Sequence, residues 1–250
     1  MQLLAVRWLG SLLLFLHEQR SAWSRPKLVV TELLQQTMEI SFNSLLPVIV
    51  VVIPFGAVVA VEGYNFVEPF QAQPMLSGFL LMVTLREIAP VVTALMVAAQ
   101  SGGATTGMIA SMRLKHQFDA IELCAVPTSA LIIIPRLLAF VVACPLINLI
   151  ASASGIAGGS WIALVRKPLD PGIYFANLFV LLKPFDLWFG LVKTILFGFI
   201  IGSISIYEGT IATGGAKGVG VAANRAIVRS VIGCIILNYL FTAIVLNIWG

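Results

Sequence analysis

Five long apolar segments constrain this chain more than any other feature of its sequence. They cover residues 45–61, 75–99, 130–150, 187–206 and 228–248, and a helix needs about 20 mostly apolar residues to cross a bilayer. Only 10% of the residues are charged and 59% are hydrophobic, with a mean hydropathy of +1.01, whereas a soluble domain has about 25% charged residues. The segments of alternating polarity typical of an outer-membrane barrel do not occur. The sequence therefore predicts an all-α integral membrane protein with five transmembrane helices.

The first 27 residues are predicted to lie outside the transmembrane bundle. Residues 1–16 are apolar apart from Gln2, Arg7 and Ser11, and their uninterrupted part, residues 8–16, is too short to span. We expect a helix lying in the membrane interface, followed by a turn at residues 25–27. A secretory signal is the alternative, but a polar run at residues 17–20 follows where a small-residue cleavage site would stand. The chain is thus expected to form one domain, residues 1–250, with the bundle in residues 28–250.

Proline and glycine mark the expected bends, turns and close helix contacts. Pro47, Pro54 and Gly56 predict a bent or broken first span. Residues 170–172, Asp-Pro-Gly, are a turn signal in the loop predicted over residues 166–186, and a flexible turn is expected at residues 214–220. Glycine pairs in residues 103–107, 155–159 and 198–202 match the small-xxx-small pattern. We interpret them as packing within one protomer, with a dimer contact as the alternative.

A charged, amphipathic stretch at residues 112–126 separates the second and third spans. As a helix, residues 114–125 place Leu114, Phe118, Ile121 and Ala125 on one stripe and Lys115, Asp119 and Glu122 on another. The stretch is either a surface helix between two spans or a docking element for a partner. Nine Lys and Arg residues near span ends lie on its side, with the N-terminus, against three on the other. The positive-inside rule then predicts that this side is cytoplasmic and that the C-terminus is periplasmic.

Four of the polar residues inside the predicted spans are candidates for a buried cluster. Arg86 and Glu87 lie in the second span, Lys193 in the fourth and Asn238 in the fifth. Ionisable groups at such depths cost about 2.5–3.5 kcal/mol on insertion scales and tend to pair inside a bundle or line a wet cavity. We predict that these residues face inward as one polar patch. The patch either joins helices or contacts a ligand headgroup.

The sequence gives little support to catalysis, metal binding or nucleic-acid binding. The two histidines lie outside the apolar segments and have no zinc-type spacing, and no Gly-x-Ser-x-Gly elbow occurs. The glycine-rich residues 214–220 lack the residue order of a phosphate-binding loop. The three cysteines are well separated, and the basic residues are dispersed. We therefore expect a non-enzymatic membrane protein without a cofactor or metal of its own, and an intramembrane enzyme is the least favoured alternative.

Several blocks of the sequence resemble the MlaE (also called YrbE) permeases of MCE lipid-transport systems. The resemblance runs in register over residues 62–242 and rests on residues 86–95 (REIAPVVTAL), 112–113, 119–122 (DAIE), 134–136 (IPR), 214–216 and 218–220. It implies an interfacial N-terminal helix, five spans, two permease copies beneath a ring of MCE proteins, and a cytoplasmic ABC ATPase that binds ATP and Mg²⁺.

The resemblance also implies a function and roles for particular residues. The chain would be the permease subunit that moves phospholipid or a related lipid across the space between membranes, located in a bacterial inner membrane. Residues 112–126 would be the coupling helix that docks in the ATPase, and the polar patch would lie near the lipid pocket. The coupling residues would be Arg113, Lys115, His116, Phe118, Asp119 and Glu122. A structural anchor for the MCE ring without a lipid pathway is the alternative.

This chain departs from the family pattern at five positions. Gln100 stands where the family usually has Arg, Met108 where it has Glu, and Asn238 where it has Asp, while His116 and Gln117 replace an acidic pair. The changes remove negative charge from the coupling region and from the membrane interior. They bear on ATPase docking and on lipid preference. They also leave open whether the second permease is an identical copy or a sister chain.

Overall fold

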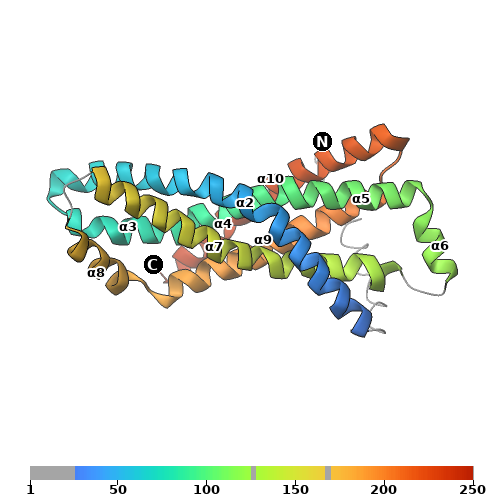
Figure 1. Cartoon of the computed structure of the whole chain (residues 1–250), viewed down its shortest axis with the longest axis horizontal. Coiled ribbons are helices and arrows are strands. Elements are labelled where there is room, and N and C mark those ends of the chain that lie inside the picture. Colours follow the sequence, from blue (N-terminus) through green and yellow to red (C-terminus); the bar gives the residue numbers. More distant parts are fainter. Residues whose placement is uncertain (1–25, 125–127, 167–169, 250) are drawn as a thin grey trace.

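The computed structural model describes residues 26–124, 128–166 and 170–249 (Figure 1), and the predicted interfacial helix lies outside these ranges. Within them the chain is almost entirely helical, and this part contains no strand. In the described part of the chain, five helical stretches are long and apolar enough to cross a membrane: Val30–Phe70, Leu76–Leu114, Leu131–Val165, Pro184–Thr210 and Gly215–Val245. The predicted all-α fold with five spans is therefore confirmed.

The spans lie side by side along the long axis of the molecule, with short helices at its two ends (Figure 1). Helix α2 leads through two short turns into the second span, which is followed by α6. Helix α8 follows α7 and lies at the end of the molecule opposite α6. The elements are α2 (Pro26–Val67), η2 (Glu68–Phe70), η3 (Gln73–Met75), α3 (Leu76–Val83), η4 (Thr84–Ile88), α4 (Ala89–Val97), η5 (Ala98–Gly102), α5 (Gly103–Leu114), α6 (Gln117–Leu123), η6 (Ser129–Ile133), α7 (Ile134–Arg166), α8 (Pro171–Leu181), α9 (Pro184–Thr210) and α10 (Gly215–Trp249).

Helix α2 stays one helix through both of its prolines and bends visibly along its length (Figure 1). It packs along α7, where the two backbones meet at a pair of glycines. A Cβ atom on Gly56 would lie 2.1 Å from the carbonyl oxygen of Gly155, a distance that no side chain tolerates. The glycines at residues 155–159 therefore serve packing inside the protomer. The main core lies next to this contact and is built around Val48, Val52 and the fully buried Phe140 and Phe197.

The second span is interrupted twice by a π-helical turn, at η4 and at η5. An inserted residue of this kind widens one turn of the helix, and such turns are frequent at functional sites. Turn η4 carries Arg86 and Glu87, and η5 carries Gln100 and Ser101. Arg86, Glu87 and Gln100 thus lie where the hydrogen bonding of this span is irregular.

Helices α9 and α10 differ in how much of their surface the rest of the bundle covers. In the most apolar 18-residue window of each span, 67% of α9 is buried but only 11% of α10. Helix α9 is therefore central, whereas most of α10 faces outward with apolar side chains such as Ile232, Ile236 and Leu240.

Three local expectations need correction. The helix predicted over residues 114–125 is shorter, because α5 ends at Leu114 and His116 adopts a left-handed conformation (φ 54°) before α6 begins; Ala125 lies outside the described residues. The loop predicted at residues 166–186 contains α8. The turn signal at residues 170–172 is the start of this helix, where the Asp170 carboxylate accepts hydrogen bonds from the backbone N–H groups of Gly172 and Ile173. The flexible turn predicted at residues 214–220 is also shorter, since α10 begins at Gly215.

Candidate functional site

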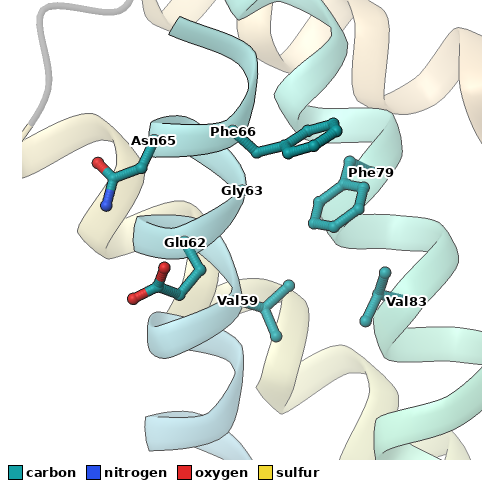
Figure 2. Close-up of a pocket in the computed structure, with 7 residues that line it drawn as sticks. All are labelled: Val59, Glu62, Gly63, Asn65, Phe66, Phe79 and Val83. Atoms are coloured by element: carbon teal, nitrogen blue, oxygen red, sulfur yellow. The ribbon is translucent and has the colours of Figure 1, made fainter.

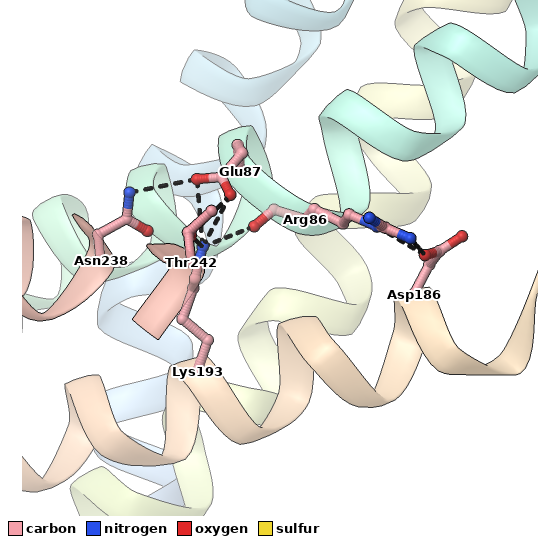
Figure 3. A network of polar contacts seen from close by, with 6 residues as sticks. All are labelled: Arg86, Glu87, Asp186, Lys193, Asn238 and Thr242. Carbon is pink, nitrogen blue, oxygen red and sulfur yellow. Dashed lines mark hydrogen bonds and ion pairs between the residues drawn. The ribbon is translucent and has the colours of Figure 1, made fainter. Parts of the chain in front are cut away.

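Lys193 of α9 lies at the centre of a polar network inside the bundle (Figure 3). Its side chain is fully buried. The ammonium nitrogen lies 3.1 Å from each carboxylate oxygen of Glu87 and donates to the Arg86 carbonyl oxygen at 2.9 Å. It also lies 3.0 Å from Thr242 Oγ1 and 4.9 Å from the centre of the Phe189 ring. A buried ammonium group is tolerated here because its donors find acceptors and its charge is paired.

Glu87 is held from three sides. Besides Lys193, it accepts a hydrogen bond from Thr242 Oγ1 at 3.0 Å and one from Asn238 Nδ2 at 3.2 Å. Thr242 and Asn238 lie one turn apart on α10, so the carboxylate joins η4 to α10 as well as to α9. About 39% of the Glu87 side chain remains exposed. One edge of the network is thus accessible from outside the bundle.

Arg86 points away from this centre toward the start of α9 (Figure 3). Its Nε donates to Asp186 Oδ1 at 2.7 Å, and Nη2 lies 2.5 Å from the same oxygen. The guanidinium carbon lies 5.8 Å from the centres of the Phe185 and Phe189 rings, a distance typical of a cation–π contact. Asp186 is 4% exposed. The network therefore contains two cations and two anions, and its formal charge is zero.

The structure brings together all four polar residues that the sequence placed in the patch, and adds two. The sequence predicts a loop at Asp186, although Pro184 followed by an acidic residue is a pattern typical of the first turn of a helix. Thr242 carried no signal, because a threonine in an apolar span is most often turned toward its own backbone. The two additions complete the pairing of Arg86 and of Glu87.

The network borders a pocket of about 450 Å³ that is lined mostly by apolar side chains. Its lining residues are Met82, Val83, Arg86, Glu87, Lys183, Phe185, Phe189, Thr242 and Val245. A second pocket of about 570 Å³ lies between the end of α2 and α3 (Figure 2), where Phe66 and Phe79 extend toward each other. Val83 lines both pockets. We call the two together the α3 groove. The Arg86–Lys193 network lies at one end, and the other end is lined by Val59, Phe66 and Phe79 together with Glu62 and Asn65.

Helix α6 presents charged side chains at the opposite end of the molecule. Phe118 is buried against Ile109, Ile132, Ile133 and Ile206. The charged and polar residues of this region are exposed: Arg113, Lys115, His116, Gln117, Asp119 and Glu122. Asp119 lies 2.9 Å from His116 Nδ1 and 3.6 Å from Arg113 Nη1. The structure thus separates Phe118, which holds α6 to the bundle, from the other five predicted coupling residues, which face outward.

Among the residues that the structure describes, no three His, Cys, Asp or Glu side chains gather as metal ligands would. The α3 groove offers a ligand charged side chains for pairing and apolar side chains for contact.

Comparison with known proteins identifies the family. The family model described as Permease MlaE matches residues 33–244. The chain belongs to the MlaE permease family. A probable ABC transporter permease protein of Rickettsia felis is 35% identical over 93% of this chain and 90% of its own length. The intermembrane phospholipid transport system permease protein MlaE of Haemophilus influenzae is 28% identical, covering 85% and 82%. The chloroplastic protein TRIGALACTOSYLDIACYLGLYCEROL 1 of Arabidopsis thaliana is 29% identical over 67% of this chain and 48% of its own length.

Three of the departures of this MlaE-family chain lie against charged side chains, and one of them, His116, contacts Asp119 as described above. Asn238 donates to Glu87, as described above. Met108 contacts Arg136, whose guanidinium is buried and donates from Nε to Gln36 Oε1 at 2.8 Å and from Nη1 to Met108 Sδ at 3.2 Å. A thioether is a weak acceptor for a charged donor. Gln100 is exposed on η5. No local sequence pattern predicts the Arg136 contact, because its partners lie 100 and 28 residues away along the chain.

Proposed function

We propose that this MlaE-family chain is the permease subunit of an ABC transporter that moves phospholipid or a related lipid between membranes. The observation that carries the proposal is the α3 groove. One end offers Arg86, Lys183 and the exposed edge of Glu87. The other end is mostly apolar, with Phe66 and Phe79, and has Glu62 as its one charged lining residue among those that the structure describes. A lipid has the same division into a charged headgroup and apolar chains. Phospholipid transport in the name of the Haemophilus relative agrees with this assignment.

The groove binds the two parts of a lipid by different means. Lys183 and Arg86 would contact a headgroup phosphate, because both cations line the pocket and Arg86 keeps 23% of its side chain exposed. Met82, Val83 and Phe79 would contact the acyl chains through apolar burial. Glu87 and Asp186 keep the local charge balanced when the groove is empty. A lipid that enters therefore replaces water around a prearranged set of charges.

Energy for the cycle is assigned to a separate cytoplasmic ATPase that binds ATP and Mg²⁺ and docks on α6. The exposed charges of α6 are suited to a protein surface, whereas Phe118 fixes the helix to α5, η6 and α9. The second span runs without a chain break from Leu76 to Leu114, so movement at α6 reaches Arg86 and Glu87 through α5, η5 and α4. The π-helical turns at η5 and η4 are places where such a helix can shift its hydrogen bonding.

The other partners follow from the family resemblance. A second permease copy or a sister permease would cover part of α10, whose surface is mostly uncovered in the single chain. A ring of MCE proteins would stand at the end that carries α8. The complex would lie in a bacterial inner membrane with the N-terminus cytoplasmic and the C-terminus periplasmic.

Reconstituted lipid transfer tests the proposal. The complex of permease, ATPase and MCE protein is placed in vesicles, and ATP-dependent transfer of a fluorescent phospholipid is measured. Lys193→Ala should abolish transfer, because it removes the cation that positions Glu87 at the edge of the groove. Lys217→Ala is the matched control, since Lys217 is exposed near the start of α10, away from the groove. Intact assembly with unchanged transfer by Lys193→Ala would instead support a structural anchor for the MCE ring.

Docking on α6 has a test of its own. The variant Asp119→Lys with Glu122→Lys should lose co-purification with the ATPase and remain folded, because both side chains are exposed. Unchanged co-purification would contradict the coupling role.

A further inference from the structure

Helix α8 carries an apolar surface that the α3 groove does not use. The twelve residues 171–182 contain no charged side chain and are bounded by Asp170 and Lys183. Figure 1 shows α8 at the end of the molecule opposite α6. The sequence predicted a loop here, so no function was assigned to this segment.

One face of α8 is attached to the bundle. Tyr174 and Leu178, one turn apart, are buried in the cluster that contains Leu76 and Leu80. The Tyr174 hydroxyl lies 3.1 Å from Ser160 Oγ on α7, and Asn177 Nδ2 donates to the Pro74 carbonyl oxygen at 3.3 Å. The polar groups of α8 side chains are therefore directed toward α7 and η3.

The remaining surface of α8 is apolar and uncovered in the single chain. Ile173, Phe179 and Val180 are 53%, 70% and 79% exposed. Phe175 and Leu182 extend the same surface. Exposed apolar area of this kind marks a surface that contacts either a membrane or another protein.

Three observations favour the membrane. Both neighbours of α8 along the chain, α7 and α9, are long and apolar enough to cross a membrane. Exposed tryptophans lie on both of those spans near α8, Trp161 at 70% and Trp188 at 66%, and tryptophan is enriched where a span meets the membrane interface. The exposed side chains also offer no hydrogen-bonding group, whereas a protein interface has about one hydrogen bond per 100–200 Å².

We propose that α8 is embedded in the leaflet at the end of the bundle opposite α6, with Phe179 and Val180 among the lipid chains. Its 11 residues extend about 16 Å at 1.5 Å per residue, too short to cross a bilayer, so the helix stays within one leaflet. Leu181 of α8 lies against Gly78 of α3, where an added Cβ would approach it to 2.5 Å. The embedded helix therefore holds the α3 wall of the groove at the depth of that leaflet.

Fluorescence quenching of the full chain in phospholipid vesicles tests the placement. In a Cys124→Ser background, which leaves the buried Cys144 and Cys234, Phe179→Cys is labelled with the dye NBD. Leu146→Cys, 49% exposed on α7, is the lipid-facing control, and Glu68→Cys, exposed on η2, is the aqueous control. Each sample is quenched separately by spin-labelled phosphatidylcholine and by iodide present on both sides of the membrane.

The proposal predicts that the Phe179→Cys label loses as much fluorescence to the spin-labelled lipid as the Leu146→Cys label does, and much less to iodide than the Glu68→Cys label. Val180→Cys provides a second position with the same expectation. Iodide quenching equal to that at Glu68→Cys would overturn the proposal, because it places α8 in water. Protection from both quenchers would also overturn it, since a second copy or a protein partner would then cover the helix. The outcome does not depend on lipid transport by the α3 groove.

Discussion

Replacing Lys193 with Met removes the ammonium group that lies 3.1 Å from both carboxylate oxygens of Glu87. At that separation and an effective dielectric constant of about 20, the Coulomb attraction is roughly 5 kcal/mol. The cost of taking both groups out of water offsets about half of it or more. We therefore expect a coupling free energy of about 2 kcal/mol between the two side chains, because Glu87 stays partly solvated.

A double-mutant cycle measures this coupling. The variants Lys193→Met, Glu87→Gln and their combination are purified, and their free energies of unfolding are compared by titration with a denaturing detergent. Each single variant leaves a charge without its partner, so the combined variant should be more stable than the sum of the two single losses predicts. Lys217→Met is the matched control and should change stability by less than about 0.5 kcal/mol. If the losses in unfolding free energy of the two single variants simply add in the combined variant, Lys193 and Glu87 do not act as a pair.

Two further substitutions test the helix packing and the Arg136 contact. Gly198→Ala should destabilise the chain by about 1–3 kcal/mol, because the new Cβ would lie 2.4 Å from the Phe140 carbonyl oxygen. The control Gly220→Ala, with no atom within 4 Å of its Cβ, should be neutral or stabilising in thermal unfolding. Equal effects of the two substitutions would contradict the close approach of α7 and α9. Met108→Glu should raise the unfolding temperature, since it places a carboxylate where Arg136 Nη1 now contacts a thioether, and a lower temperature would show that the guanidinium is already satisfied.

Much of the fold could be predicted from the sequence because apolar length is a local property. The five spans follow from runs of about 20 apolar residues, whatever their neighbours are. The positions at which the spans end are predicted less accurately. Helix α2 continues through Pro47 and Pro54 because neighbouring protein can satisfy the backbone groups that a proline frees.

At the ends of the bundle, the predictions that are wrong concern turns and helix starts. Asp170-Pro171-Gly172 fits a turn and also fits a capped helix start, and the burial of Tyr174 and Leu178 against α3 and α7 favours the helix. In the same way, His116 adopts a positive φ that periodicity alone does not reveal, so α6 begins later than predicted.

The candidate site could be predicted only in part. The sequence predicts Arg86, Glu87 and Lys193 as site residues because a charged side chain is costly inside a membrane. This energetic argument identifies each residue separately and does not say which residues pair. Their pairing depends on contacts between residues about 100 or more positions apart, which no local pattern contains. Asp186 illustrates the limit: its sequence position suggested a loop, and its function as the partner of Arg86 appears only when α9 packs against η4.

The central claim is that lipid occupies the α3 groove during an ATP-driven cycle, and site-specific photo-crosslinking tests it most directly. The photoreactive residue p-benzoylphenylalanine replaces Phe79 in the groove or, as a control, Phe199, which is 45% exposed on α9. Both should form lipid adducts in the membrane when the reconstituted complex is irradiated. If lipid occupies the groove during the cycle, ATP hydrolysis should change the amount of phospholipid adduct at position 79 and leave the adduct at position 199 unchanged. Adducts that respond identically to ATP at the two positions would contradict it.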